Sequence, residues 1–481
     1  MLFRRPNAST MRRFHFAPRM KTTWKFLLSE NRRTAALALP IIAGNVGQML
    51  LGWVDAVMVG RVGVVPLGAC GFANTLLSVP LVFGFGLLSA VSVHASHAHG
   101  EGSAEGSASS VRGGFAVAGM LSLLVVGSLA ALLPYLAIFG QPAEVNAASR
   151  AFLTICTWSL VPVFFTTVAK NFCEAHGHPW RPFWIMMCGV GLNAFLNWIL
   201  IFGNWGAPAM GLEGAGVATL IARIGVMLAV MGYPASSLSL RKFWPTRWLA
   251  PGVFQAAKGI LSVGLPSGAM TLCEVSGFAF GAIMMGWIGV DPLAANQIAM
   301  TCVATTFMVP LGLSQAVSVR VGQAHGAGRF ALIRPIVFGA IVLSILFMSI
   351  SLVAFIFCGK TIASWFIRDP SVRLMTAQLL FMGGIFQIFD GIQVVSAGAL
   401  RGFKDTKIPM WIGILSYWLV ALPVSWAAAF VFEAGACGIW LGFVVGLAVA
   451  AAALFSRVRW RMARVPSPSP RSAGNQGERS P

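Results

Sequence analysis

The chain has 481 residues, of which 57% are hydrophobic and only 10% are charged. Soluble globular domains carry about 25% charged residues, so this composition excludes a soluble globular protein. The long unbroken apolar runs also exclude an outer-membrane β-barrel and indicate a polytopic membrane protein built from helices. The net charge of +20 does not indicate nucleic-acid binding, because the basic residues lie in tails and short breaks between apolar runs.

The N-terminal segment, residues 1–33, carries nine Lys or Arg residues. It lacks the apolar core of a secretory signal peptide, so we expect a basic cytoplasmic tail. Twelve apolar stretches follow, each long enough to cross a bilayer as a helix. We therefore predict an all-α protein with spans near 35–59, 67–98, 114–138, 149–170, 184–203, 213–235, 258–287, 292–320, 335–358, 373–400, 409–430 and 436–456.

The two halves of the chain repeat each other at a spacing of 226 residues. Leu39-Pro40 recurs as Leu265-Pro266, and the run Gly86-Leu-Leu-Ser-Ala-Val-Ser-Val93 recurs as Gly312-Leu-Ser-Gln-Ala-Val-Ser-Val319. Because the repeat spans an even number of helices, both halves keep the same orientation and form parallel repeats. We predict two pseudo-symmetric six-helix lobes, with the ligand path in the cleft between them.

The division that follows places an N-lobe at 34–235, a cytoplasmic linker at 236–257 and a C-lobe at 258–456. The last segment, 457–481, is basic and rich in Pro and Ser, and we expect it to be disordered. If both tails are cytoplasmic, 28 of the 34 Lys and Arg residues lie on that side, five lie opposite and Arg223 lies within a span. This asymmetry follows the positive-inside rule and predicts a multi-pass protein of the cell inner membrane with cytoplasmic termini.

Three of the fourteen acidic residues lie within spans, namely Asp55 in the first, Glu274 in the seventh and Asp390 in the tenth. A charge at mid-membrane costs at least about 2.5–3.5 kcal/mol, so such residues are functional candidates. A salt bridge is the alternative, but only Arg223 lies deep in a span, and it can serve at most one acid. A carboxyl group that water reaches can hold a proton, Na⁺ or a cationic substrate and exchange one for another. We predict that these three acids couple ions and bind substrate.

Amide side chains accompany the acids at helical spacing. Gln48 precedes Asp55 by two turns, and Asn193 and Asn197 are one turn apart in the fifth span, so each pair shares a helix face. In the second half, Gln297 lies in the eighth span. Hydrogen bonding between helices is the alternative role for each amide.

Prolines and aromatic residues recur in the same spans. Pro40 and Pro266 are hinge candidates because proline kinks a helix, although a static kink that eases packing is equally consistent. Trp53, Phe278 and Phe386 bracket the acids. They either pack or line a path for flat cations through cation–π contacts.

Metal and cofactor chemistry is not indicated. His94, His97, His99 and His325 lie near span ends, but residues two apart do not share a helix face and make a poor zinc site. The eight cysteines form no CxxC pair and are expected to be free thiols. With no nucleotide-binding loop and no nucleophile motif, we predict neither direct use of ATP nor an enzyme.

Together these features resemble the multidrug and toxic compound extrusion (MATE) family, in particular its bacterial NorM-like branch. The resemblance runs from about residue 35 to 456. The segments that carry it are Leu39-Pro40, Gly52-x-x-Asp55-x-x-x-Val-Gly60, Ser89-Ala90-Val-Ser, Leu192-Asn193-x-x-Leu-Asn197, Pro266 with Glu274, and Leu400-Arg401-Gly402-Phe-Lys-Asp405-Thr406-Lys-Ile-Pro409.

The resemblance implies a twelve-helix antiporter without a cofactor that exports cationic amphipathic drugs in exchange for H⁺ or Na⁺. We expect a monomer whose partners are small cationic organic substrates and membrane lipid. Some relatives carry a tyrosine one turn before the acid of span ten, where this chain has Phe386, which favours H⁺ over Na⁺. By resemblance, Glu274 and Asp390 are the coupling acids of the C-lobe, with Gln297 nearby. Any bound Na⁺ is expected at Glu274 and Asp390. The resemblance also implies an N-lobe polar site made of Asp55, Gln48, Asn193 and Asn197.

Two alternatives differ in the residues they require. A lipid-linked oligosaccharide flippase of related architecture should line its cavity with arginines for a pyrophosphate, whereas here three deep acids face the single Arg223. A membrane-embedded enzyme or a receptor is opposed by the symmetrical halves and by the lack of a catalytic constellation.

Overall fold

The computed structural model describes residues 24–248 and 250–464, which are almost entirely helical. Twelve helices in this part of the chain are long and apolar enough to cross a membrane, as the sequence predicted. Eleven are single α-helices: α1 (Trp24–Gly60), α2 (Val64–Gly100), α3 (Ala104–Leu132), α4 (Ala143–Ala175), α5 (Trp180–Phe202), α6 (Gly211–Ser236), α7 (Val253–Ile288), α8 (Val290–Gly326), α9 (Ile333–Phe366), α10 (Pro370–Gly402) and α13 (Gly435–Ala463).

The eleventh span, Lys407–Val431, is interrupted by two π-helical turns. It consists of α11 (Lys407–Ile414), the π-helix η5 (Leu415–Ala421), α12 (Leu422–Trp426) and the π-helix η6 (Ala427–Val431). A π-turn inserts an extra residue and rotates the side chains that follow it, and such turns often occur at functional sites. Here η5 carries Tyr417, which contributes to the site described below.

The helices extend past the apolar stretches at both ends of the chain. Helix α1 begins at Trp24, so part of the segment predicted to be an N-terminal tail is helical. Its polar first turns are stabilised because the buried Glu30 carboxylate pairs with Arg33 at 2.9 Å and also with Arg320 of α8. At the other end, α13 continues to Ala463. The rest of both predicted tails lies outside the described residues.

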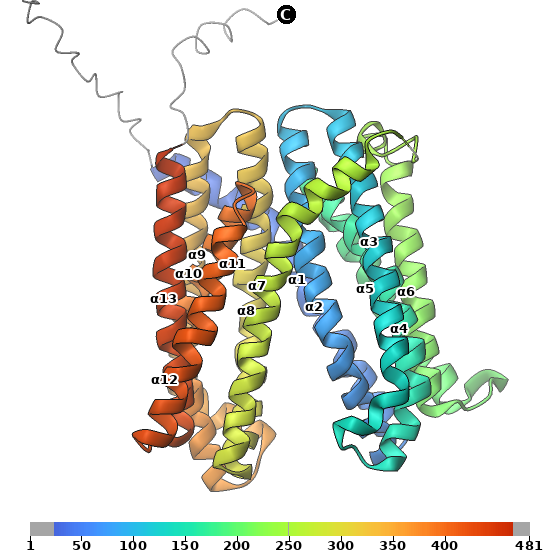
Figure 1. Ribbon diagram of the computed structural model, residues 1–481, viewed down its shortest axis with the longest axis vertical. Coiled ribbons are helices and arrows are strands. Elements are labelled where there is room, and N and C mark those ends of the chain that lie inside the picture. The colour runs from blue at the N-terminus through green and yellow to red at the C-terminus, as the bar shows by residue number, and fades with distance from the viewer. Residues whose placement is uncertain (1–23, 249, 465–481) are drawn as a thin grey trace, which may run out of the picture.

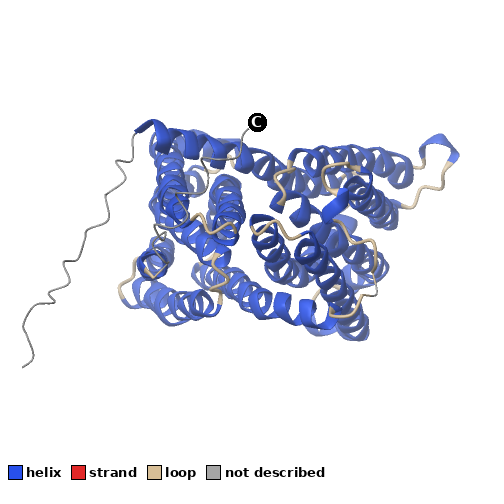
Figure 2. Cartoon of the chain, turned by 90° about the horizontal axis from the view of Figure 1, so that it is seen from above, coloured by secondary structure: helices blue, strands red, loops and turns tan. Residues whose placement is uncertain are grey.

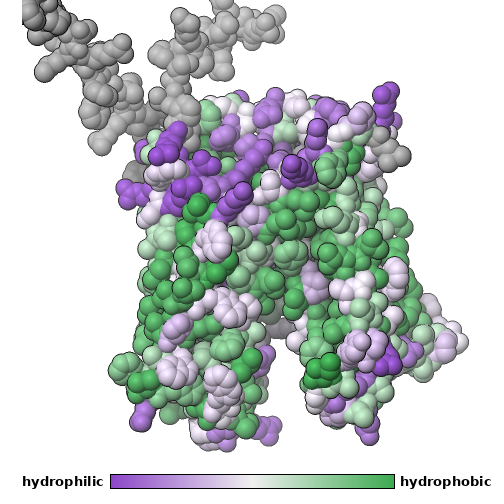
Figure 3. All heavy atoms as spheres, viewed as in Figure 1, coloured by the Kyte–Doolittle hydropathy of each residue, from purple (hydrophilic) through white to green (hydrophobic). Residues whose placement is uncertain are grey.

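The helices form two groups that lie side by side when the molecule is seen from above (Figure 2). In the side view the groups meet at the face where residues 24 and 464 lie, which we call the terminal face, and separate toward the opposite face, the open face (Figure 1). A hollow divides the two groups at the open face, and a broad apolar band covers both on the face that Figure 3 shows. This arrangement confirms the prediction of two lobes.

Helices α1 and α7, the first of each repeat, cross from one lobe to the other (Figure 1). In α1, Ile41 lies in the apolar core of the C-lobe, whereas Val59 lies in that of the N-lobe. In α7, Ile260 lies in the N-lobe core and Met284 in a C-lobe core. The sequence assigned each of these helices to a single lobe, but in the structure each one ties the two lobes together.

The crossing of α7 over α2 is a direct contact between backbones. A Cβ atom at Gly86 would lie 2.7 Å from Cα of Gly268, and one at Gly264 would lie 2.2 Å from the carbonyl oxygen of Leu87. Only glycine allows so close an approach at these positions. Pro266 lies between the two α7 glycines, so the proline predicted as a hinge falls at the point where the helix changes lobes.

Candidate functional site

The first polar site lies in the N-lobe and is centred on Asp55 of α1. Its Oδ1 accepts a 2.6 Å hydrogen bond from Asn197 Nδ2 of α5. The same amide donates to Asn193 Oδ1 at 3.1 Å, and Asn193 donates to Thr219 Oγ1 of α6 at 3.2 Å. Both asparagines are fully buried, as hydrogen-bonded amides between helices can be. The structure thus joins Asp55, Asn193 and Asn197 into one chain and adds Thr219.

A cavity of about 170 Å³ adjoins this chain and is lined by Gln48, Asn193 and Thr219. Arg223 and Lys170 also face the cavity, yet each has a partner of its own. Arg223 Nη1 donates to Ser159 Oγ at 2.6 Å, and Lys170 Nζ lies 3.2 Å from the Glu174 carboxylate.

Asp55 and Arg223 interact electrostatically, but among the described residues the direct partner of the Asp55 carboxylate is an amide. Within the described ranges, the salt bridge considered as the alternative role for this acid does not form. Thr219 was not predicted as part of this site, and Arg223, one helical turn away in α6, was considered only as a salt-bridge partner.

The second site lies in the C-lobe, where Glu274 of α7 and Asp390 of α10 are close enough to interact electrostatically. Asp390 is only 3% exposed, and its Oδ1 has no hydrogen-bond partner in the part of the chain that the structure describes. Glu274 is half-buried. Two adjacent carboxylates repel each other, and a shared cation or proton relieves that repulsion. The pair can therefore hold a proton or a cation between its two carboxyl groups.

Two further residues approach Glu274, and neither was predicted as part of the site. The Tyr417 hydroxyl neighbours the carboxyl group, although the two do not form an aligned hydrogen bond. Arg401, at the end of α10, interacts with Glu274 electrostatically and donates from Nη2 to Ser314 Oγ at 2.8 Å. The sequence placed Arg401 at a span end, and nothing in the pattern indicated that its side chain turns inward.

Aromatic rings pack around the C-lobe acids. Phe278 meets Phe386 and Tyr417 at ring-centroid distances of 5.8 Å, and Phe386 meets Trp440 at 5.8 Å. Phe386 is 2% exposed, so in this conformation its ring packs in the core and does not line open space. Tyr417 enters the same cluster from the eleventh span. Trp53, by contrast, is 49% exposed.

The sequence predicted Gln297 to lie near these acids. It is exposed on α8, and its side chain forms no hydrogen bond within the described residues. Buried amides of this lobe include its neighbour Asn296, which accepts from Trp440 Nε1 at 3.0 Å, and Gln387, which donates to Val303 O at 3.2 Å. Gln387 lies one turn before Asp390 on the buried face of α10. A coupling role for Gln297 stays a prediction.

Within residues 24–248 and 250–464, no cluster of three or more His, Cys, Asp or Glu residues is suited to hold a metal ion. All eight cysteines have free thiols, as predicted from their spacing.

Two parallel six-helix lobes, each with a carboxyl group at an internal polar site, define a polytopic membrane transporter. The MatE family model matches residues 40–199 and 266–427, one segment in each repeat. The chain therefore belongs to the MatE family, as the sequence motifs suggested. Membership of a transporter family also confirms that the chain is not an enzyme.

Relatives of this chain extend over nearly its full length. It is 32% identical to a probable multidrug resistance protein NorM of Bradyrhizobium diazoefficiens over 92% of this chain and 96% of the relative. It is 34% identical to the protein of the same name from Pseudomonas putida, over 91% of this chain and 96% of the relative.

Solved structures show the same fold. A mutant of the MATE transporter VcmN from Vibrio cholerae superposes with a TM-score of 0.83 at 21% identity, covering 91% of this chain and 98% of that one. The eukaryotic MATE transporter AtDTX14 superposes with a TM-score of 0.78 at 23% identity, covering 92% and 100%.

Proposed function

We propose that the protein is a secondary active antiporter that exports cationic amphipathic compounds in exchange for H⁺. The observation that carries the proposal is the Glu274–Asp390 pair, two carboxyl groups that interact electrostatically inside the C-lobe, with Asp390 Oδ1 unpartnered among the described residues. The relatives named as multidrug resistance proteins support the substrate class. No ATP is required, because a tenfold downhill H⁺ ratio supplies about 1.4 kcal/mol, the cost of a tenfold uphill ratio of a monovalent cation exchanged one for one.

The exchange follows from the position of the acids on the crossing helices. Asp55 lies on α1 and Glu274 on α7, and each helix is packed into both lobes. A cation or proton that binds either acid changes the contacts of that helix in one lobe, and the helix carries the change to the other. Binding chemistry is thereby coupled to the angle between the lobes, which alternating access requires.

The N-lobe cavity is the proposed substrate site. Gln48 lines the cavity, and Asp55, joined to the Asn193 wall through Asn197, attracts a cationic group from behind that wall. Leu51, Met186 and Met187 offer an apolar and adaptable surface to an aromatic body. The cavity also carries Arg223 and Lys170, the one feature that favours the flippase alternative. Because Ser159 and Glu174 already bind these two basic side chains, Arg223 and Lys170 are poorly placed to bind a pyrophosphate.

The C-lobe pair is the proposed coupling site, with H⁺ as the ion. A proton needs one acceptor oxygen, and the unpartnered Asp390 Oδ1 supplies it. A Na⁺ ion needs several oxygens to replace its hydration shell. The pair itself supplies two carboxyl groups, and the Tyr417 hydroxyl lies next to Glu274.

Transport by purified protein in liposomes tests both the activity and the ion. We expect an imposed pH gradient without Na⁺ to drive uptake or release of an ethidium-like dye, and a Na⁺ gradient at constant pH to drive none. Dye movement that requires the Na⁺ gradient would replace H⁺ by Na⁺. Absence of dye movement under either gradient, with transport of a lipid-linked sugar instead, would support the flippase.

The proposed location is the cell inner membrane, with both termini in the cytoplasm. The positive-inside distribution supports it, and the open face then points away from the cytoplasm. A fluorescent protein fused after the last residue is expected to fold and fluoresce, whereas a C-terminal alkaline phosphatase is expected to stay inactive. The reverse pattern would invert the orientation.

A further inference from the structure

Two side-chain hydrogen bonds join the lobes at the terminal face. His97 Nε2 of α2 lies 2.7 Å from the carbonyl oxygen of Gly402 in α10. Gln323 Nε2 of α8 donates to the carbonyl oxygen of Ala175 in α4 at 2.8 Å. Since a carbonyl oxygen only accepts, His97 must carry a hydrogen on Nε2. Each bond runs from one lobe to the other, in opposite directions.

The two bonds are related by the internal repeat. His97 and Gln323 are 226 residues apart, the spacing of the repeat itself. Ala175 and Gly402 are the last residues of the fourth helix in each repeat, α4 and α10. The last carbonyl groups of a helix have no intrahelical donor, so they are free to accept from a side chain. The fold has thus built the same contact twice.

Close backbone packing encloses both bonds. A Cβ atom at Gly326 would lie 2.2 Å from the carbonyl oxygen of His97, and one at Gly100 would lie 2.2 Å from the carbonyl oxygen of Gln323. These glycines are also 226 residues apart. Helices α2 and α8 therefore touch along their last turns, and the two hydrogen bonds lie beside that seam.

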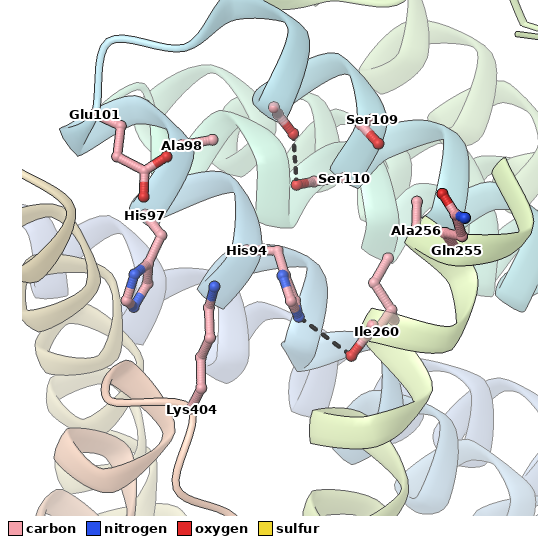
Figure 4. A pocket seen from close by; sticks show the side chains of 12 residues that line it. His94, His97, Ala98, Glu101, Ser109, Ser110, Gln255, Ala256, Ile260 and Lys404 are labelled. Carbon is pink, nitrogen blue, oxygen red and sulfur yellow. Dashed lines mark hydrogen bonds between the residues drawn. The ribbon is translucent and has the colours of Figure 1, made fainter. Parts of the chain in front are cut away.

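A cavity of about 260 Å³ adjoins the seam between α2 and α8, and charged and polar side chains line it (Figure 4). His94, His97 and Glu101 of α2 line it from the N-lobe, and Lys404, just after α10, reaches into it from the C-lobe. Hydrophilic groups from both lobes thus face each other next to a closed contact. Water already has a place to enter if the contact separates.

We propose that the His97–Gly402 and Gln323–Ala175 hydrogen bonds form a latch that holds the terminal face closed. Release of the latch separates α2 from α8 and connects the cavity with the path between the lobes. The proposal rests on the alternating access proposed above, because the latch matters only if this face opens during transport. His97 and Gln323 then act as positioning residues, which set the balance between the two conformations without binding the transported ions.

The two hydrogen bonds of the latch, which we call its arms, have different donors, an imidazole in one and an amide in the other. This difference provides an internal control for the substitutions. His97 faces His325 of the C-lobe at a ring-centroid distance of 5.0 Å, whereas Gln323 contributes a neutral amide. Replacing His97 by Gln makes the two arms chemically alike and keeps a donor for Gly402. Replacing it by Ala removes the arm.

The test measures how fast a buried position becomes accessible from the terminal face. Ala98, 6% exposed and on the cavity wall, is changed to Cys in the full-length protein. A membrane-impermeant maleimide is applied to the terminal face in vesicles, and labelling of that peptide is read by mass spectrometry. This readout is independent of the eight native cysteines and of dye transport. Failure of the latch is thereby separated from failure of the proposed export.

We expect the pair His97→Ala with Gln323→Ala to raise the labelling rate roughly tenfold, which corresponds to about 1.4 kcal/mol in the conformational equilibrium. Each single Ala variant should give a smaller increase, and His97→Gln should restore the parental rate. His99→Gln is the matched control, because His99 contacts His176 and Phe243 within the N-lobe. Labelling at the parental rate in the double variant would overturn the proposal. If that variant does not fold, equal rates for His97→Ala and His97→Gln would overturn it.

Discussion

Asp55 Oδ1 accepts a 2.6 Å hydrogen bond from Asn197 Nδ2, and this bond joins residues that are 142 positions apart in sequence. It fixes the C-terminal half of α1 to α5 of the N-lobe, while the N-terminal half of α1 packs in the C-lobe around Ile41. A hydrogen bond to a charged carboxylate is stronger than one to a neutral group. Neutralising Asp55 therefore weakens the attachment of a helix that both lobes share.

The first prediction concerns the donor of this bond. Asn197→Ala removes the amide that holds Asp55, and hydrogen bonds to charged groups contribute roughly 1.5–3 kcal/mol. We expect a lower melting temperature in detergent and a dye-export rate reduced at least several-fold, with normal insertion. Asn204→Ala is the control, since Asn204 is near the end of the same span and donates only to Trp198 O at 2.8 Å. Export at the parental rate by Asn197→Ala would show that the bond does not orient Asp55 for transport.

The second prediction concerns the buried acid of the C-lobe. Asp390→Asn keeps the size of the side chain but removes the group that holds a proton, so we expect dye export to be abolished and insertion to be unchanged. The measurement is dye efflux from cells together with the amount of protein in the membrane. Asp369→Asn serves as the control, because Asp369 is an exposed cap of α10 that accepts from the backbone of Ser371 at 2.8 Å. Robust efflux by Asp390→Asn would remove Asp390 from the mechanism.

The sequence predicted the features that depend on local pattern. Twelve apolar stretches become twelve helices because a bilayer allows few other structures. Asn193 and Asn197 point the same way because they are one helical turn apart, and the structure joins them to Asp55.

The features that it missed depend on which helices become neighbours. Tyr417 and Arg401 reach Glu274 from other helices, and no spacing along the chain indicates that approach. For the amides of α8, the rotation of the helix about its axis decides which side chain is buried. Asn296 is buried, whereas the next residue, Gln297, is exposed. The sequence also did not predict that α1 and α7 cross from one lobe to the other. The apolar residues of such a helix have the same pattern whichever lobe they pack into.

The third prediction tests the crossing of α2 and α7. Gly86→Val places a branched side chain against the backbone of Gly268, where even a Cβ atom would lie 2.7 Å from Cα. Forcing extra atoms into a packed contact costs about 1–3 kcal/mol. We expect a clear fall in melting temperature and loss of export, because α7 carries Glu274. Gly71→Val in the same helix is the control, since a Cβ atom there has no neighbour within 4 Å. Similar melting temperatures for the two variants would show that the crossing tolerates separation.

The fourth prediction concerns pH and His176, which follows α4 at the terminal face and is 6% exposed. Its ring lies 4.2 Å from that of Phe172 and 4.8 Å from that of Phe243. Burial among these rings disfavours the charged imidazolium and lowers the pKa of His176 to about 4 from the ordinary value of 6.5. The neighbouring His99 and His178 lower this pKa further.

The sign of the effect follows from proton binding. Above pH 6.5 the ring of His176 is neutral in both the folded and the unfolded chain, so His176 contributes no pH dependence to the stability there. Between pH 6.5 and 4 the unfolded chain binds a proton that the folded chain does not, so stability falls as the pH falls. At about 1.4 kcal/mol per pH unit, the loss approaches 3 kcal/mol at the lower limit.

His176→Gln removes the titrating ring while keeping an amide that can donate to Phe172 O, the partner of His176 Nδ1 at 2.9 Å. We expect the melting temperature of the parental protein in detergent to fall between pH 7 and pH 4.5, and that of the variant to fall less over the same range. Every other titrating group is shared by the two proteins, so the difference between the two curves isolates His176. Parallel curves would mean that the ring is already protonated, or equally protonated in both states, and that its burial among Phe172 and Phe243 does not exclude the charge.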